Sequence, residues 1–76
     1  MRAYVLVRLH RGERELVDYM RKQDHVERAD IVYGEYDVVI IANVKDIREL
    51  SHLVLDDIRK RFDVERTSTL IVTESE

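Results

Sequence analysis

Two short apolar runs dominate the pattern of hydrophobic and polar positions along this chain. Residues 38–42 read Val-Val-Ile-Ile-Ala without a polar break, directly after a turn that contains Gly34. Residues 3–9 read Ala-Tyr-Val-Leu-Val-Arg-Leu and are equally rich in β-branched and aromatic residues. A strand with one face in water alternates apolar and polar residues, whereas an unbroken run indicates packing on both faces. We therefore predict two central strands, at 3–9 and 37–44, each covered on both sides.

The remaining segments predict two helices and two further strands. Residues 13–23 carry an apolar stripe of Leu16, Val17 and Met20, which is typical of an amphipathic helix. Asp46 and a Glu three residues later form a capping box ahead of a second helix, which we expect to reach residue 62. Strands are predicted at 26–33, where poor alternation indicates an edge strand or a bulge, and at 64–73. The stripe of the second helix has three- and four-residue spacing and consists of Ile47, Leu50, Val54 and Ile58, with Leu53 and Phe62 beside it.

This order of elements, βαββαβ, predicts an α+β fold of the ferredoxin-like type. Four antiparallel strands would form one sheet, and right-handed crossovers would place both helices on the same face. The other face would then be bare, although the two central strands carry apolar residues on it. Because a patch of that size is unusual on a soluble monomer, we expect a second copy to pack against it, sheet to sheet.

Composition agrees with a small domain that gains stability by association. The chain has 76 residues and no cysteine, so we expect a single domain over 1–76 without disulfides or thiolate metal sites. Its net charge of −3 argues against a general nucleic-acid binder. Neither a signal peptide nor an apolar segment long enough to cross a bilayer is evident, so we expect a cytoplasmic protein with no membrane partner.

Two motifs, in this order of elements, resemble a known family. Residues 34–37, Gly-Glu-Tyr-Asp ahead of an apolar strand, are similar to the Gly-x-Tyr/Phe-Asp turn of Lrp/AsnC (leucine-responsive/asparagine regulator) effector domains, also called RAM domains. Residues 64–72, Val-Glu-Arg-Thr-Ser-Thr-Leu-Ile-Val, resemble the last strand of the same family, and the resemblance covers residues 1–74. Full-length members carry an N-terminal helix-turn-helix. Here Met1 lies just before the first predicted strand, so we expect a stand-alone effector domain with no helix-turn-helix and no direct DNA binding.

The resemblance implies a function and an assembly. Domains of this family dimerise through their sheets, and the dimers form rings, often octamers, which are tetramers of dimers. A free amino acid binds between dimers, near the Gly-x-x-Asp turn and the start of the last strand. The resemblance thus implies an amino-acid-binding regulatory oligomer that modulates transcription of amino-acid metabolism genes, through a full-length Lrp/AsnC paralogue as partner.

The same two motifs hold the side chains that a zwitterionic amino acid needs. Asp37 can pair with the amine, and the backbone N–H groups around Gly34 can approach the carboxylate. Hydroxyls of the last strand can donate or accept hydrogen bonds. Each residue also has a structural explanation: Asp37 can cap the hairpin, the Thr/Ser run suits a solvent-facing strand, and Tyr36 suits an interface. The predicted ligand-binding residues are Gly34, Tyr36, Asp37, Thr67, Ser68, Thr69, Leu70 and Ile71.

Catalytic and cofactor chemistry finds little support in the sequence. The histidines at 10, 25 and 52 fall in different elements without ligand spacing, and two glycines cannot build a phosphate loop. We predict a non-enzyme with no catalytic residues, no metal and no cofactor. Two alternatives stay open. One is a structural partner that co-assembles with such regulators whatever the ligand. The other is a dimeric α/β-barrel enzyme, which would need a cavity under the helices. We expect that space to be filled instead by Met20, Leu50 and Val54.

Overall fold

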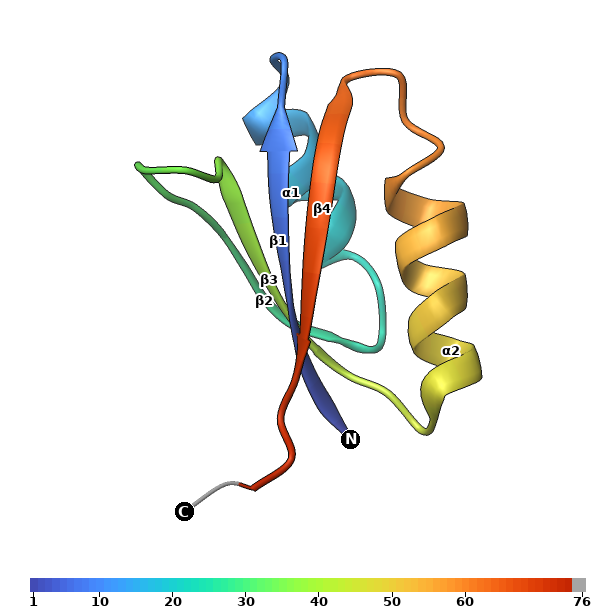
Figure 1. The fold of residues 1–76 in the computed structure, drawn as a ribbon. Helices are drawn as coiled ribbons and strands as arrows, with labels where there is room; N and C mark the ends of the chain where they lie inside the picture. Colours follow the sequence, from blue (N-terminus) through green and yellow to red (C-terminus); the bar gives the residue numbers. More distant parts are fainter. Residues whose placement is uncertain (75–76) are drawn as a thin grey trace.

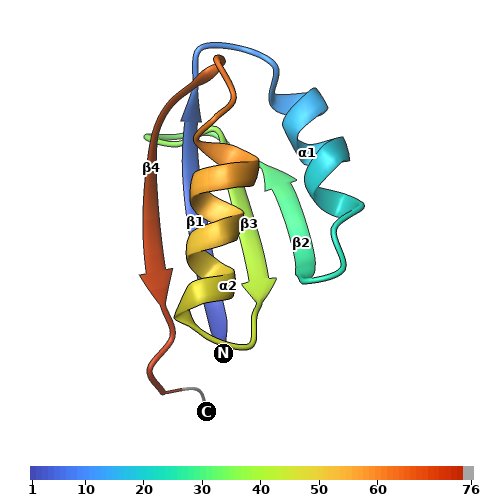
Figure 2. The same ribbon diagram turned by 90° about the vertical axis from the view of Figure 1, so that its right-hand side faces the viewer.

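Four strands and two helical regions follow one another in the computed structural model, which describes residues 1–74. All strand pairs are antiparallel, and the sheet order is β2-β3-β1-β4. Both helical regions lie on one face of the sheet (Figures 1 and 2), so the predicted ferredoxin-like fold is confirmed. The elements are β1 (Arg2–Leu9), α1 (Glu13–Arg21), β2 (Val26–Ile31), β3 (Val38–Asn43), α2 (Ile47–His52), the π-helical segment η1 (Leu53–Ile58) and β4 (Val64–Ile71).

The hydrophobic core lies between the sheet and the two helical regions. Alternate residues of the central strands point into it, because successive side chains of a strand face opposite sides. From α1 the predicted stripe of Leu16, Val17 and Met20 is fully buried. Within residues 1–74, the buried apolar residues are Ala3, Val5, Val7, Leu9, Leu16, Val17, Met20, Ala29, Val38, Ile40, Ala42, Val44, Leu50, Leu53 and Ile58.

The residue that precedes each helix explains why the helix starts there. Gly12 precedes α1 with φ at 85°, and a Cβ at this position would lie 2.9 Å from Asp63 Oδ2. Only glycine meets both conditions without strain. At α2, Asp46 Oδ1 accepts a hydrogen bond from Glu49 N at 2.9 Å, as the capping box predicts. Glu49 in turn accepts from the backbone N–H of Lys45 at 3.1 Å, one residue earlier than the usual box.

The second helical region departs from the predicted regular helix. After His52 the backbone hydrogen bonds span five residues instead of four: Arg59 N donates to Val54 O at 2.8 Å. A π-helical turn contains more residues than an α-helical one, so the 3.6-residue stripe does not continue through it. Leu50, Leu53 and Ile58 are buried, but the prediction for the stripe's two ends was wrong: the flanking residues Ile47 and Phe62 are exposed.

The two outer strands are shorter than the pattern predicted. β2 ends at Ile31, and Val32 N donates to Asp37 O at 2.9 Å to close the base of the hairpin. Its register shifts between Val26 and Arg28, and β2 is an edge of the sheet, so both predicted features of this strand are present. β4 ends at Ile71, and one further bond from Val72 N to Arg2 O continues its pairing with β1.

Candidate functional site

The sheet face opposite the helices carries an apolar strip. The registers of β1 with β3 and β4 align its side chains in cross-strand rows. The strip includes four half-buried residues, Tyr4, Leu6, Val39 and Ile41. Beside them, Leu70 is 49% exposed to solvent. The strip consists of two adjacent rows, Leu70–Tyr4–Ile41 and Ser68–Leu6–Val39.

Charged side chains border this strip. Arg28 and Asp30 of β2 stand opposite Ile41 and Val39, and an ion pair joins Arg28 to Asp30. The hydrogen bond to Asp30 raises the pKa of Arg28, which holds this guanidinium in its charged form. Arg2 pairs with Glu27 at 3.0 Å at the next position along the border. An apolar centre with a charged rim is the composition of a protein–protein interface.

Asp37 ties the β2–β3 hairpin to the end of β1. Its Oδ2 accepts a hydrogen bond from Leu9 N at 2.8 Å, and its backbone N–H donates to Val7 O at 2.9 Å. Its Oδ1 lies 3.7 Å from Arg8 Nη1, which also donates to the carbonyls of Gly34 and Glu35 at 3.2 Å each. The Asp37 carboxylate therefore has a structural partner in another strand, 28 residues away.

A second arginine completes a polar cluster at this end of the sheet. Arg66 stands directly opposite Arg8 across β1 and β4, and its guanidinium lies 5.4 Å from the centroid of the Tyr36 ring. Two arginines that face each other across strands repel. The carboxylates of Asp37 and Glu65, each 3.7 Å from one of the two guanidinium groups, offset this repulsion. We refer to Arg8, Tyr36, Asp37 and Arg66 as the hairpin-end cluster.

The structure brings only part of the predicted ligand-binding set together. Thr67 pairs with Val7 from one side, and Asp37 bonds to Val7 from the other, so Asp37 and Thr67 lie two strands apart, roughly 10 Å. Gly34 and Tyr36 lie at the same end of the sheet as Asp37, because Arg8 donates to the Gly34 carbonyl and Arg66 lies over the Tyr36 ring. Figure 1 shows the hairpin between β2 and β3 at the upper left. Leu70 and Ile71 pair with Tyr4 and Ala3, three and four residues beyond Thr67 along β4. Because a strand rises about 3.4 Å per residue, they lie about 10 Å or more from Thr67.

The predicted β4 residues also divide between the two faces of the sheet. Ser68 and Leu70 share a face with Leu6 and Tyr4, whereas Thr67, Thr69 and Ile71 face the helix side. One copy of the chain therefore does not surround a single ligand with all eight residues. The arginines of the hairpin-end cluster were absent from the predicted set, because the register that sets Arg8 opposite Arg66 is a long-range property.

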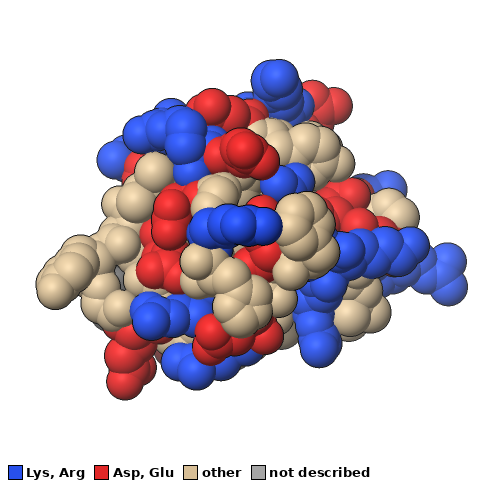
Figure 3. All heavy atoms as spheres, turned by 90° about the horizontal axis from the view of Figure 1, so that it is seen from above, with Lys and Arg blue, Asp and Glu red and all other residues tan. Residues whose placement is uncertain are grey.

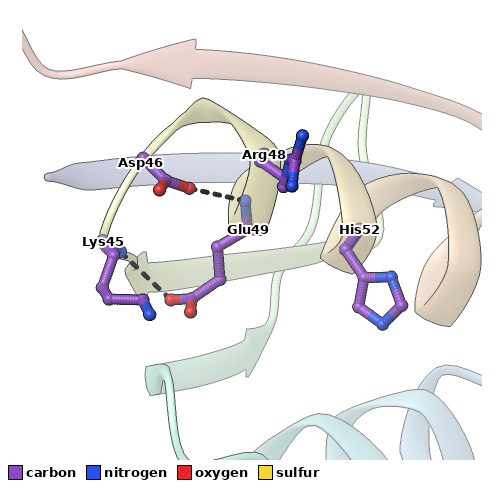
Figure 4. A pocket seen from close by; sticks show the side chains of 5 residues that line it. All are labelled: Lys45, Asp46, Arg48, Glu49 and His52. Carbon is purple, nitrogen blue, oxygen red and sulfur yellow. Dashed lines mark hydrogen bonds between the residues drawn. The ribbon is translucent and has the colours of Figure 1, made fainter.

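Two hollows border α2 outside the core. The first, of about 300 Å³, lies at the start of the helix and is drawn in Figure 4; its lining residues are Lys45, Asp46, Arg48, Glu49 and His52. Its two carboxylates already accept the capping bonds described above. The second, of about 250 Å³, lies between the helical region and β4, and it contains Thr69 and Ile71 of the predicted set. Its other lining residues are Ile47, Leu50, Ser51, Val54 and Leu55.

Charge is mixed over the end of the molecule that carries the hairpin. Figure 3 shows basic and acidic side chains interspersed across this end, without a large field of either sign. Within residues 1–74, no group of three or more His, Cys, Asp or Glu side chains is placed to hold a metal ion. Over the same described part of the chain, no helix is long and apolar enough to cross a membrane.

Comparison with protein families decides the relationship. The model of the family described as the Lrp/AsnC ligand binding domain matches residues 2–76. The chain belongs to this Lrp/AsnC ligand-binding family. The predicted resemblance is thereby confirmed over almost the whole chain. Among curated protein sequences, none matches the chain.

Solved structures agree with this assignment. TTHA0845 from Thermus thermophilus is 32% identical, with a TM-score of 0.89, over 99% of this chain and 95% of that one. The transcriptional regulator NMB0573 from Neisseria meningitidis, solved as a complex with L-Met, is 25% identical with a TM-score of 0.82, over 96% of this chain. AsnC of E. coli shares the fold at 21% identity and a TM-score of 0.86, over 97% of this chain. The Lrp/AsnC ligand-binding domain described here spans about half the length of these two regulators, 49% and 51%.

Proposed function

We propose that this chain is an amino-acid-binding regulatory domain rather than an enzyme. The observation that carries the proposal is the match of residues 2–76 to a ligand-binding family, together with the likeness to a regulator solved in complex with L-Met. The interior supports it as well, because most of the space under the helices is filled by buried side chains such as Leu16, Met20 and Leu53. An α/β-barrel enzyme would need a cavity there with His or Asn catalytic groups, and the lining of the hollow beside β4 contains neither.

The hairpin-end cluster supplies the chemistry that an amino acid requires. The guanidinium of Arg66 is half-exposed, and a carboxylate can accept paired hydrogen bonds from it. The ligand amine would lie toward Glu65 and Asp37, whose carboxylates already border the two arginines. The Tyr36 ring, under the Arg66 guanidinium, would pack against the ligand's aliphatic part. Thr67, Thr69 and Ile71 line the helix side of β4 and would contribute from a neighbouring copy rather than the same one.

Dimerisation through the apolar strip belongs to the same proposal. The strip presents a cross-strand row of Leu70, Tyr4 and Ile41 toward solvent, and a second copy would cover it in the manner of one sheet packed on another. A domain of this length gains little stability from its own core, which favours association. We propose that dimers associate further and place ligands between them, and that full-length paralogues join the same assembly.

Calorimetric titration with each of the twenty amino acids tests the proposed function. We expect heat of binding from one amino acid or a few related ones. Removing the Arg66 charge in Arg66→Gln should weaken that binding about tenfold or more, because a hydrogen bond to a charged group contributes roughly 1.5–3 kcal/mol. Arg59→Gln, an exposed change at the end of η1, is the matched control and should bind as the wild type does.

The outcomes separate the function from the site. Binding that survives Arg66→Gln unchanged would reject the hairpin-end cluster and keep the function. No heat from any amino acid, in a folded and associated protein, would reject the function itself. If a full-length paralogue then still co-purified with the chain, with or without amino acids, the ligand-independent structural partner would be the better account.

A further inference from the structure

The two edges of the sheet are treated very differently. At the β2 edge, Val32 N donates to Asp37 O, so alternation along the strand turns the backbone groups of Ala29 and Ile31 outward. The outward carbonyl of Ala29 accepts a hydrogen bond from Arg21 Nε at 3.0 Å. β2 also contains a register shift and charged residues at positions 27, 28 and 30. A bulge, charges and a side-chain cap are the devices that keep an edge strand from pairing with another chain.

The β4 edge has none of these devices along its C-terminal half. Val72 N donates to Arg2 O, so the same alternation turns the backbone N–H and C=O groups of Thr67, Thr69 and Ile71 outward. Among the residues that the structure describes, no side chain bonds to these outward groups. Residues 67–73 contain no charge, no proline and no glycine, and five of the seven are β-branched. This is the composition of a strand that pairs readily with another.

The helix side of this edge is also uncovered. In Figure 2 the helical region α2 lies over the middle of the sheet, and β4 runs along the margin beside it. The second hollow opens here, and Ile47, Leu55 and Ile71 on its walls are each between 43% and 56% exposed. A strand added beside β4 would extend the floor of this hollow and shield these three side chains from water.

We propose that β4 pairs antiparallel with β4 of a second copy of this chain, centred on Thr69. Thr69 then faces Thr69 of the partner, and Thr67 faces Ile71, so the outward backbone groups of both edges bond to each other. Glu65 and Arg66 face the uncharged Thr73 and Val72, so no like charges meet across the pairing. The uncharged run is self-complementary in this arrangement, which favours a second copy over an unrelated peptide. This contact uses the edge of the sheet and is separate from the proposed dimer contact through the apolar strip.

Two adjacent residues of β4 allow the two contacts to be tested apart. Thr69→Lys places two like charges opposite each other at the edge, on the helix side, and leaves the apolar strip untouched. Ser68→Lys points to the other face and adds a charge to the strip while leaving the edge free. Solution mass by light scattering, at fixed protein and salt concentration, should fall for Thr69→Lys to that of the strip dimer. Far-ultraviolet circular dichroism should stay that of the wild type, because residue 69 is exposed on an edge.

Charge reversal then makes the test specific. Thr69→Glu alone should show the same reduced mass, and an equimolar mixture of Thr69→Lys with Thr69→Glu should regain the wild-type mass, since opposite charges now face each other. Thr69→Cys offers a second reading in a chain without cysteine: paired strands set facing Cα atoms about 5.5 Å apart, within disulfide range, so mild oxidation should cross-link two copies.

The proposal is overturned if Thr69→Lys keeps the wild-type mass, or if the charge-swapped mixture fails to restore it. It is likewise overturned if oxidised Thr69→Cys stays uncross-linked while the wild type is larger than a dimer. A mass that falls for Ser68→Lys alone would leave the strip contact as the account of association and reject the edge contact.

Discussion

Replacing Asp37 separates its structural contact from any contact with a ligand. The carboxylate accepts the Leu9 N–H at 2.8 Å, and Leu9 is 5% exposed, so water cannot easily take the place of the lost acceptor. Asp37→Ala leaves a buried backbone donor unpaired, at a cost of about 1–3 kcal/mol. Asp37→Asn keeps an oxygen for the Leu9 N–H and loses only the 3.7 Å ion pair with Arg8, a partly exposed pair that contributes at most about 1 kcal/mol.

We therefore expect Asp37→Ala to lower the free energy of unfolding by about 2 kcal/mol, and Asp37→Asn by less than half of that. For a domain of this size, a loss of about 2 kcal/mol lowers Tm by roughly 8–16 °C. Urea denaturation at one fixed protein concentration measures the difference, with the m-value checked for constancy. Asp18→Ala is the control, because the pair of Asp18 with Arg14 is exposed and 4.0 Å long.

Two results would refute this reasoning. If Asp37→Ala unfolded within about 0.5 kcal/mol of the wild type, the bond to Leu9 would not hold the end of β1. If Asp37→Asn were as unstable as Asp37→Ala, the loss would come from the charge and not from the hydrogen bond. With stability measured this way, Asp37→Asn becomes the appropriate variant for ligand titrations, since it keeps the fold.

Three further stability predictions follow from the core and the helix starts. Gly12→Ala should lose about 2 kcal/mol in the same urea assay, because its φ of 85° and the nearby Asp63 carboxylate both oppose a side chain; an unchanged midpoint would contradict this. Asp46→Ala should lose about 1 kcal/mol through the missing helix cap, and a loss below a few tenths would show that the cap is dispensable. Leu53→Ala should lose about 2–5 kcal/mol by leaving a cavity, whereas the half-exposed Leu55→Ala should lose under about 1 kcal/mol in an unassociated protein; similar losses would contradict the burial pattern.

Local patterns were sufficient for the elements and their order. The unbroken run at 38–42 and the mixed run at 3–9 became the two central strands, and the Leu16, Val17 and Met20 stripe became the buried face of α1. These features are set by side-chain period within one element, which a sequence displays directly. The same holds for the cap at Asp46, whose partner is three residues away.

What the patterns missed depends on contacts between distant segments. The π-helical segment interrupts the 3.6-residue period and the helical region ends at Ile58, so Phe62 lies outside the buried stripe. Ile47, in the first turn of α2, is exposed although it precedes that segment. Strand register is likewise a long-range property: it sets Arg8 opposite Arg66 and brings Asp37 to Leu9. For this reason the predicted ligand-binding residues of β4 divide between two faces, a separation that their adjacency along the chain conceals.

The apolar strip on the helix-free face is the feature on which the proposed assembly depends, and solution mass tests it most directly. Light scattering over a dilution series should report a mass at least twice the 9.1 kDa of one chain. Ser68→Lys should lower the number of chains per assembly. A wild-type protein that keeps the mass of one chain up to millimolar concentration, folded and soluble, would contradict the account.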